Sequence, residues 1–210
     1  GLMMCLFGTG ELVEMRTPHG SLQGVTAARE GNRIFGYRGP QVLEWSINTS
    51  LSDDPSTTPS QVRATERLLA SVPDNMGMHT DVNENSDGTL LAVGVDFRDT
   101  GERGIAIVNI QTGEVRAIRG VNHAGHIQFS HGSPYLLSFA GLQDRLWVVD
   151  VREGQPRCIH PQAEGEYVTH ECWWLGDMLT FCGGFRDKES HVKVIDPLTG
   201  EVRIVGAGAW

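Results

Sequence analysis

The chain has 210 residues, of which 40% are hydrophobic and 20% are charged, and its formal net charge is −9. This charge argues against nucleic acid as a partner, because a phosphate backbone needs a basic protein surface, but a local cluster of Arg, His or metal can still hold a small anion. The longest apolar stretch, residues 2–7, is far shorter than the roughly 20 residues that a membrane helix needs, so no membrane partner is expected.

Turn glycines recur along the chain with spacings of 57, 44 and 44 residues. They are Gly31, Gly88, Gly132 and Gly176. Two short β-rich strands are predicted after each of these turns, at 33–37 and 42–47, 89–93 and 104–110, 135–139 and 145–151, and 178–181 and 191–195. A further strand completes the last three units, at 115–118, 156–159 and 202–205.

Strands separated by Gly, Asp and Asn turns at this spacing indicate antiparallel meanders. A period of about 40–50 residues with four strands is typical of a β-propeller blade. We therefore predict an all-β fold, a β-propeller of four-stranded antiparallel blades that forms one propeller segment over residues 1–210. The predicted blades are approximately 20–70, 77–119, 123–160 and 167–206.

Three stretches depart from the regular repeat. The polar tract 48–61 is predicted to be an exposed loop of the first blade, followed by an outer strand at 65–69. Residues 10–15 resemble the outer strand of a preceding blade, and residues 206–210 end where another blade would begin. We therefore expect the four blades to be part of a larger propeller.

Three histidines, His79, His126 and His170, each lie six to nine residues before a turn glycine. The first strand of a propeller blade lines the central channel, so these imidazoles are predicted to approach one mouth of that channel, within reach of His123 as well. Imidazoles in a water-accessible funnel suit general acid–base chemistry or metal ligation. The alternative is that each is a structural hydrogen-bond partner.

The four cysteines form no C-x-x-C pair and show no close metal-ligand spacing. Such cysteines are commonly free thiols that pack as small apolar side chains. They favour a reducing compartment, and no signal peptide is visible at the N-terminus. We therefore expect the protein in the cytoplasm.

Three short strings then carry a family resemblance. Residues 125–130 read G-H-I-Q-F-S, residues 144–147 read D-R-L-W, and residues 169–173 read T-H-E-C-W. They resemble the H-x-Q-F-S, D-R-x-W and G-H-E-x-W strings of oligogalacturonate lyases, which are seven-bladed β-propeller enzymes. The resemblance is best over about residues 120–180, and it implies that the chain holds about four of the seven blades.

The resemblance implies metal-assisted β-elimination of short uronate oligomers, a step in pectin degradation. It marks His126 as the catalytic base and His170 as a ligand of a Mn²⁺ cofactor. Gln128, Arg145 and His79 are the candidate substrate contacts, although Gln128 and Arg145 are equally well explained as strand-pairing or turn residues. The implied partner is a small anionic oligosaccharide.

The chain departs from the family pattern in two places. The Q-x-x-H-x-H string of the remaining metal ligands does not occur, and residues 139–143 replace a stretch that contains His-Glu-Gly. The metal site is therefore not expected to be complete in this chain, which is either part of a longer enzyme or a relative that has lost the activity.

Two alternatives from other classes remain. The first is a non-catalytic propeller that serves as a binding or scaffold domain. The second is the propeller part of a serine peptidase, for which the chain offers no G-x-S-x-G nucleophile elbow.

Overall fold

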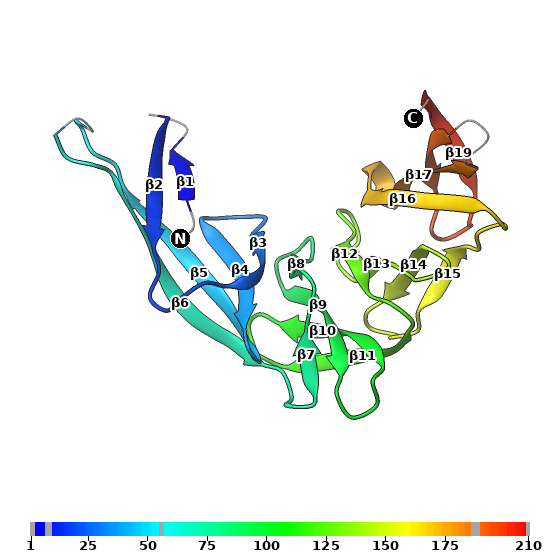
Figure 1. Cartoon of the computed structure of the whole chain (residues 1–210), viewed down its shortest axis with the longest axis horizontal. Helices are drawn as coiled ribbons and strands as arrows, with labels where there is room; N and C mark the ends of the chain where they lie inside the picture. Colours follow the sequence, from blue (N-terminus) through cyan, green and yellow to red (C-terminus); the bar gives the residue numbers. More distant parts are fainter. Residues whose placement is uncertain (1–2, 7–9, 55–56, 186–189, 209–210) are drawn as a thin grey trace.

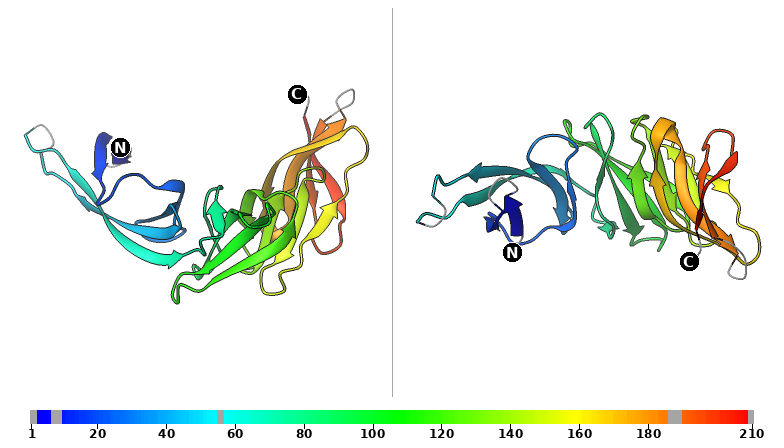
Figure 2. Two further views of the ribbon diagram at one scale, coloured as in Figure 1. Left: turned by 60° about the horizontal axis from the view of Figure 1, so that its bottom comes forward. Right: turned by 90° about the horizontal axis from the view of Figure 1, so that it is seen from above.

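The computed structural model describes residues 3–6, 10–54, 57–185 and 190–208, which form four β-sheets. Within these ranges the one helical segment is the 3₁₀ turn Leu175–Asp177, so the predicted all-β class is confirmed. The four sheets follow one another around an open arc, with the two chain ends at opposite ends of the arc (Figures 1 and 2).

The first sheet has six strands in the order β1-β2-β6-β5-β4-β3. They are β1 (Met3–Leu6), β2 (Glu11–Arg16), β3 (Gln23–Ala27), β4 (Arg33–Arg38), β5 (Gln41–Ser50) and β6 (Gln61–Ser71). The assignment of residues 10–15 to a preceding blade is wrong, because β2 pairs in parallel with β6. Met15 of β2 is buried against Trp45 and Val62, and this apolar contact explains the pairing.

The predicted loop at 48–61 is shorter than expected. Asn48, Thr49 and Ser50 continue β5 and pair with the start of β6, so the loop spans residues 51–60, of which 55–56 lie outside the described residues. Polar side chains do not prevent this pairing, because the backbone hydrogen bonds form regardless of side chain and these three residues are exposed to water.

The other three sheets have mainly antiparallel neighbours in chain order. The second contains β7 (Met76–Met78), β8 (Asn83–Glu84), β9 (Leu90–Phe97), β10 (Arg103–Asn109) and β11 (Val115–Val121). The third contains β12 (Gly125–Phe129), β13 (Leu136–Ala140), β14 (Leu146–Asp150) and β15 (Arg157–His160). The fourth contains β16 (Glu166–Trp173), β17 (Leu179–Phe185), β18 (Ser190–Ile195) and β19 (Val202–Gly208).

A repeated turn joins the last two strands of these sheets. In the second sheet, Oδ1 of Asn109 accepts hydrogen bonds of 2.9 Å from the N–H groups of Gln111 and Thr112. Gly113 then takes a φ of 73°, in the left-handed region that glycine adopts without steric cost. The segments 150–154 and 196–200 form the same turn with an Asp in place of the Asn. Local side-chain chemistry therefore sets where each hairpin turns.

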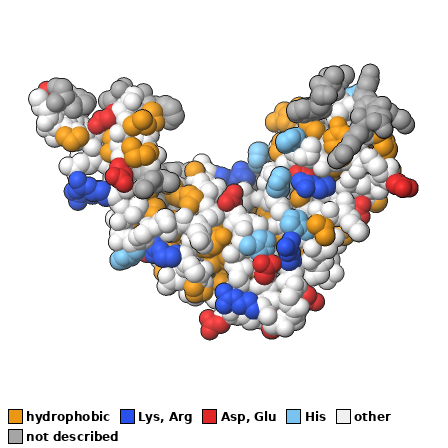
Figure 3. Space-filling model, in the orientation of Figure 1, with side chains coloured by type: hydrophobic (Ala, Val, Ile, Leu, Met, Phe, Trp, Pro, Cys, Tyr) orange, Lys and Arg blue, Asp and Glu red, His pale blue; other side chains and the backbone are white. Residues whose placement is uncertain are grey.

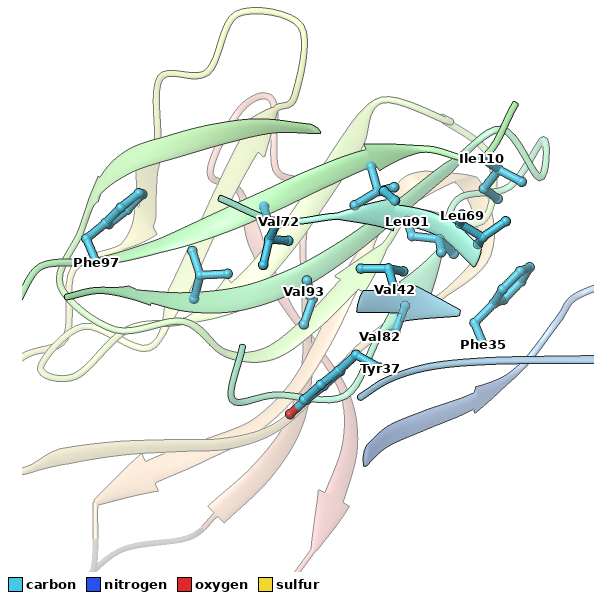
Figure 4. Packing of buried hydrophobic residues seen from close by; sticks show 14 residues of the cluster. Phe35, Tyr37, Val42, Leu69, Val72, Val82, Leu91, Val93, Phe97 and Ile110 are labelled. Atoms are coloured by element: carbon cyan, nitrogen blue, oxygen red, sulfur yellow. The ribbon is translucent and has the colours of Figure 1, made fainter. Parts of the chain in front are cut away.

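Apolar clusters fill the spaces between successive sheets. One cluster joins the first and second sheets (Figure 4), a second joins the second and third, and a third joins the third and fourth. Their large, fully buried members include Phe35 and Phe97, Phe129 and Leu137, and Leu179 and Phe181, in that order. Sheets that pack face to face in sequence are the blades of a β-propeller, as predicted, and the third and fourth have the four strands typical of a blade.

The strands that begin the blades lie toward the inside of the arc. Strand β12 contacts both β8 and β16, its counterparts in the neighbouring sheets, and all three face the concave side (Figure 1). Side chains from different blades can therefore meet there. Within the described ranges, no helix has the length and apolar character needed to cross a lipid bilayer.

Candidate functional site

His126 lies in a β-bulge of the inner strand β12. Between the pairs Gly125↔Ala140 and Gln128↔Ser138, two residues of β12 face one residue of β13, and His126 is the first of the two. Its φ is 47°, a left-handed conformation that costs a residue with a side chain about 1–2 kcal/mol. Bulges of this kind redirect side chains and are frequent next to active sites.

The same bulge recurs in two other blades. In β16 its first residue is His170, with a φ of 57°, and in β3 it is Gly24, with a φ of 56°. His126 and His170 therefore occupy the same step of the bulge, whereas His79 has a different backbone setting. His79 lies between β7 and β8, where its N–H donates to the backbone oxygen of Gly94 at 3.0 Å and the Thr80 hydroxyl accepts the N–H of Gly94 at 2.7 Å.

The His126 ring contacts a carboxylate from the next blade. Its Nδ1 lies 3.1 Å from Oε2 of Glu171 in β16. Arg145, in the turn that precedes β14, holds the same carboxylate, with Nε 2.6 Å from Oε1 and Nη2 3.2 Å from Oε2. The Glu171 side chain is 5% exposed and the His126 side chain is 56% exposed. The fixed end of the contact is thus the carboxylate.

The environment of Glu171 acts on its pKa in opposite directions. Burial by itself raises the pKa of this carboxyl group. Hydrogen bonds from Arg145 and from its own backbone N–H, together with the charges of Arg145 and His126, lower the pKa by more, so it lies below its ordinary value. Glu171 is therefore a buried carboxylate at neutral pH.

A hollow of about 780 Å³ opens beside His126. Its walls come from the first three blades, and the polar lining residues include His79, Arg103, His123, His126 and Gln128. The central part of the molecular face in Figure 3 shows several histidine side chains next to Lys and Arg side chains.

The second group of polar side chains in this hollow surrounds Asp96. Oδ1 of Asp96 lies 3.6 Å from Nε2 of His79 and 3.5 Å from Nε of Arg103. Arg103 also hydrogen-bonds Nδ1 of His123. Burial, followed by the positive charge of Arg103, lowers the pKa of His123 below its ordinary value, so this imidazole is neutral at physiological pH.

The structure brings only some of the predicted site residues to one place. His79, His126 and Gln128 line the hollow, whereas His170 and Arg145 are not among its described lining residues. Gln128 donates from Nε2 to the backbone oxygen of Glu171 at 2.9 Å. Arg145 and His126 both contact the carboxylate of Glu171. Their predicted roles as substrate contacts remain predictions.

Sequence reasoning missed three residues of this region: Glu171, Arg103 and Asp96. Glu171 stood inside the T-H-E-C-W string that carried the resemblance, and its position next to His170 was the available signal. Arg103 and Asp96 belong to no recognisable string, so only the pairing of β9 with β10 shows that they are neighbours.

The described residues do not fit a complete manganese site. Among them, no group of three or more His, Cys, Asp and Glu side chains is arranged to hold a metal ion. Mn²⁺ favours an octahedral set of ligands, and His170 is one candidate ligand for that set. A manganese ion at His170 would therefore need ligands from outside the described residues.

No protein-family model and no curated protein sequence matches the chain. Solved structures do match it. An oligogalacturonate lyase in complex with manganese superposes with a TM-score of 0.69 at 19% identity, over 89% of this chain and 53% of its own. The oligogalacturonate lyase of Vibrio parahaemolyticus gives a TM-score of 0.66 at 18% identity, over 85% of this chain and 51% of its own.

A third similar structure is the β-propeller domain of the trilobed protease from Pyrococcus furiosus. It superposes with a TM-score of 0.51 at 9% identity, over 86% of this chain and 56% of its own. The chain spans about half the length of each of the two lyases. At these identities the likeness establishes the fold, and the chain shares the β-propeller fold of the oligogalacturonate lyases that its sequence strings resemble.

Proposed function

We propose that the chain belongs to an oligogalacturonate lyase-like protein that cleaves short uronate oligomers by β-elimination. The observation that carries this proposal is the placement of His126. It is held in a left-handed bulge with Nδ1 on a buried carboxylate, and it lines a hollow that also contains Arg103. This arrangement supplies a base and a cation within one water-accessible site.

The proposed chemistry uses His126 as the base. The C5 proton of a uronate is weakly acidic because it lies beside the carboxylate. His126 takes this proton, the electron pair forms the C4–C5 double bond, and the C4–O glycosidic bond breaks, with the leaving oxygen taking up a proton. An imidazole is the side chain most often used for general acid–base proton transfer.

The developing negative charge on the uronate needs a cation. Fixed charges in a partly enclosed site stabilise such a transition state more than water does. Arg103 lines the hollow and is a candidate for this role. Mn²⁺ is carried over from the family resemblance, with His170 as its candidate ligand, and one of the similar structures is a manganese complex.

The proposal includes a role in pectin degradation in the cytoplasm. The four cysteines are free thiols, which agrees with a reducing compartment. The expected partner is a small anionic oligosaccharide, and the net charge of −9 disfavours nucleic acid.

The alternative is a propeller that binds a ligand without chemistry. The likeness to the propeller domain of a protease favours it, because the same blade arrangement occurs there. Such a domain would need the hollow but would not need an oriented imidazole.

A direct assay separates the two functions. The protein in its full natural length is mixed with digalacturonate and Mn²⁺, and ultraviolet absorbance is followed, because the product carries a double bond conjugated to a carboxylate. We expect a rise with digalacturonate and none with the neutral galactose disaccharide. Calorimetric binding of digalacturonate without any absorbance change would overturn the lyase proposal in favour of the binding domain.

A further inference from the structure

The contact between His126 and Glu171 crosses the boundary between two blades. His126 is the first bulge residue of β12, and Glu171 is the second bulge residue of β16. Two irregularities that lie 45 residues apart in sequence therefore bring these side chains to 3.1 Å. Bulges redirect side chains. A regular strand in place of either bulge would therefore not point the imidazole and the carboxylate toward each other in this way.

Glu171 is held by two donors. Arg145, just before β14, makes two hydrogen bonds to its carboxylate, and Gln128 donates to its backbone oxygen. Trp173, two residues further along β16, donates from Nε1 to the backbone oxygen of Gln128 at 2.8 Å. The carboxylate therefore has a fixed position against which the more exposed imidazole can be oriented.

We propose that Glu171 is a positioning residue that holds the neutral His126 ring in the Nδ1–H tautomer and leaves Nε2 as the proton acceptor. A carboxylate accepts hydrogen bonds and cannot donate them. The imidazole nitrogen that faces it must therefore carry the hydrogen, and the lone pair of the neutral ring is then on Nε2. This tautomer assignment deepens the proposed function. It rests on the proposed function in one respect, namely that the Nε2 lone pair takes the proton from the substrate.

The bulge itself is a feature of the fold, and the β12 copy is the one whose histidine lines the hollow, since His170 in β16 is not among its described lining residues. Gly24 begins the equivalent bulge in the first blade, where the left-handed backbone carries no side chain. In β12 the same backbone carries an imidazole at the edge of the hollow, despite the steric cost of a left-handed histidine. Non-glycine residues in such conformations cluster at functional sites.

The chain contains its own control. His160 also contacts a buried glutamate, but through the other ring nitrogen: its Nε2 lies 3.0 Å from Oε1 of Glu166. His160 is itself mostly buried and is not among the described residues that line the hollow. By the same reasoning its neutral ring is the Nε2–H tautomer.

The test is nuclear magnetic resonance of the protein labelled with ¹⁵N-histidine, whose ring nitrogen shifts distinguish the two tautomers. Spectra are recorded at about pH 8.5, roughly two units above the reference histidine pKa, where neutral rings predominate. We expect Nδ1–H for His126 and Nε2–H for His160. An Nε2–H form of His126 in the unmodified protein would overturn the proposal, and this result requires no variant.

The variant Glu171→Gln sharpens the test. The Gln amide oxygen would stay with Arg145, so the NH₂ group would face Nδ1 of His126 and convert this ring to the Nε2–H tautomer, with His160 unchanged. Glu166→Gln should convert His160 and leave His126 unchanged. If His126 keeps the Nδ1–H tautomer in the Glu171→Gln variant, the positioning role of Glu171 is contradicted.

Kinetics on the full-length protein then separate this proposal from the proposed function. Glu171→Gln should lower kcat by about 10²-fold or more and leave KM within a few-fold of its value in the unmodified protein. In the Nε2–H tautomer, Nε2 carries a hydrogen and has no lone pair for the substrate proton. Glu166→Gln should leave both constants unchanged. If the tautomers behave as expected but the protein forms no unsaturated product, the lyase function fails and the positioning stands. If product forms and Glu171→Gln keeps full kcat, the positioning role fails instead.

Discussion

The hollow has two histidine–carboxylate contacts beside it, and they differ in how the carboxylate is held. Glu171 is buried, is bound by Arg145 through two hydrogen bonds, and lies 3.1 Å from His126. Asp96 is 52% exposed, and its contacts to His79 and Arg103 are 3.6 Å and 3.5 Å. A fixed carboxylate can orient a ring, whereas an exposed ion pair contributes little. Proximity to a carboxylate is therefore not enough to identify the base.

The backbone shows the same difference. His126 is held by a bulge that recurs in three blades, whereas His79 lies at a break between two short strands. Among the described residues this break occurs in the second blade, where the Thr80 hydroxyl accepts the N–H of Gly94. The first location is a repeated feature of the propeller, and the second is a local exception.

The largest expected effect comes from removing the guanidinium that binds Glu171. Arg145→Met leaves a buried carboxylate without its main partner, so we expect the free energy of unfolding to fall by about 3 kcal/mol. Urea denaturation measures it. Arg103→Met is the matched control, because its partner Asp96 is exposed, and it should cost less than about 1 kcal/mol. Equal losses for the two variants would contradict the contrast between the two contacts.

A smaller effect is expected for Gly24→Ala. A Cβ at this position would lie 2.4 Å from Cε1 of Tyr37 and 2.5 Å from the backbone oxygen of Thr80, in a left-handed conformation. We expect a loss of about 2 kcal/mol from overpacking and backbone strain. Because Thr80 is next to His79, the histidine ring signals of His79 should shift in the same spectra while those of His126 stay in place. If the ring signals of both His79 and His126 shift, the His79–Asp96 contact and the His126–Glu171 contact are coupled.

The third prediction concerns the protonation of His123. Burial and the neighbouring Arg103 charge lower its pKa below the ordinary 6.5. For a histidine with a lowered folded-state pKa, the associated stability is present above the unfolded value and is lost as pH falls below it toward the folded value. The ring should therefore titrate below 6.5 by nuclear magnetic resonance. Arg103→Met should move this titration part of the way back, and a midpoint above 6.5 in the unmodified protein would refute the prediction.

The smallest effect is expected for Asp96→Asn. Because this carboxylate is about half exposed, its removal should change the free energy of unfolding by less than about 1 kcal/mol. The tautomer of His126 should not change in the same variant. A loss of several kcal/mol in urea denaturation would mean that the exposed contact matters as much as the buried one.

Local chemistry explains which parts of this fold could be predicted. The strand expected at 104–110 is observed as Arg103–Asn109, and the turn at Gly113 closes it, because both depend on alternation and on a glycine with positive φ. The parallel pairing of β2 with β6 could not be predicted, because it depends on Met15 reaching a buried position against residues far along the chain.

The candidate site divides in the same way. His126 and His170 could be predicted from short strings, since they occupy the same step of a repeated bulge. The Glu171–Arg145 contact could not, because residues 26 positions apart meet across two blades. Arg103 likewise enters the site through the pairing of β9 with β10 and not through any local pattern.

The most direct test of His126 as the base compares two single variants in one assay. The rate of ultraviolet absorbance increase on digalacturonate is measured for the full-length protein and for His126→Ala and His79→Ala. Loss of a general base typically lowers the rate about 10²- to 10⁴-fold, and this is the result expected for His126→Ala. His79→Ala should retain a rate within about tenfold of the unmodified protein. Full activity in His126→Ala, or a larger loss in His79→Ala, would contradict the assignment of His126 as the base.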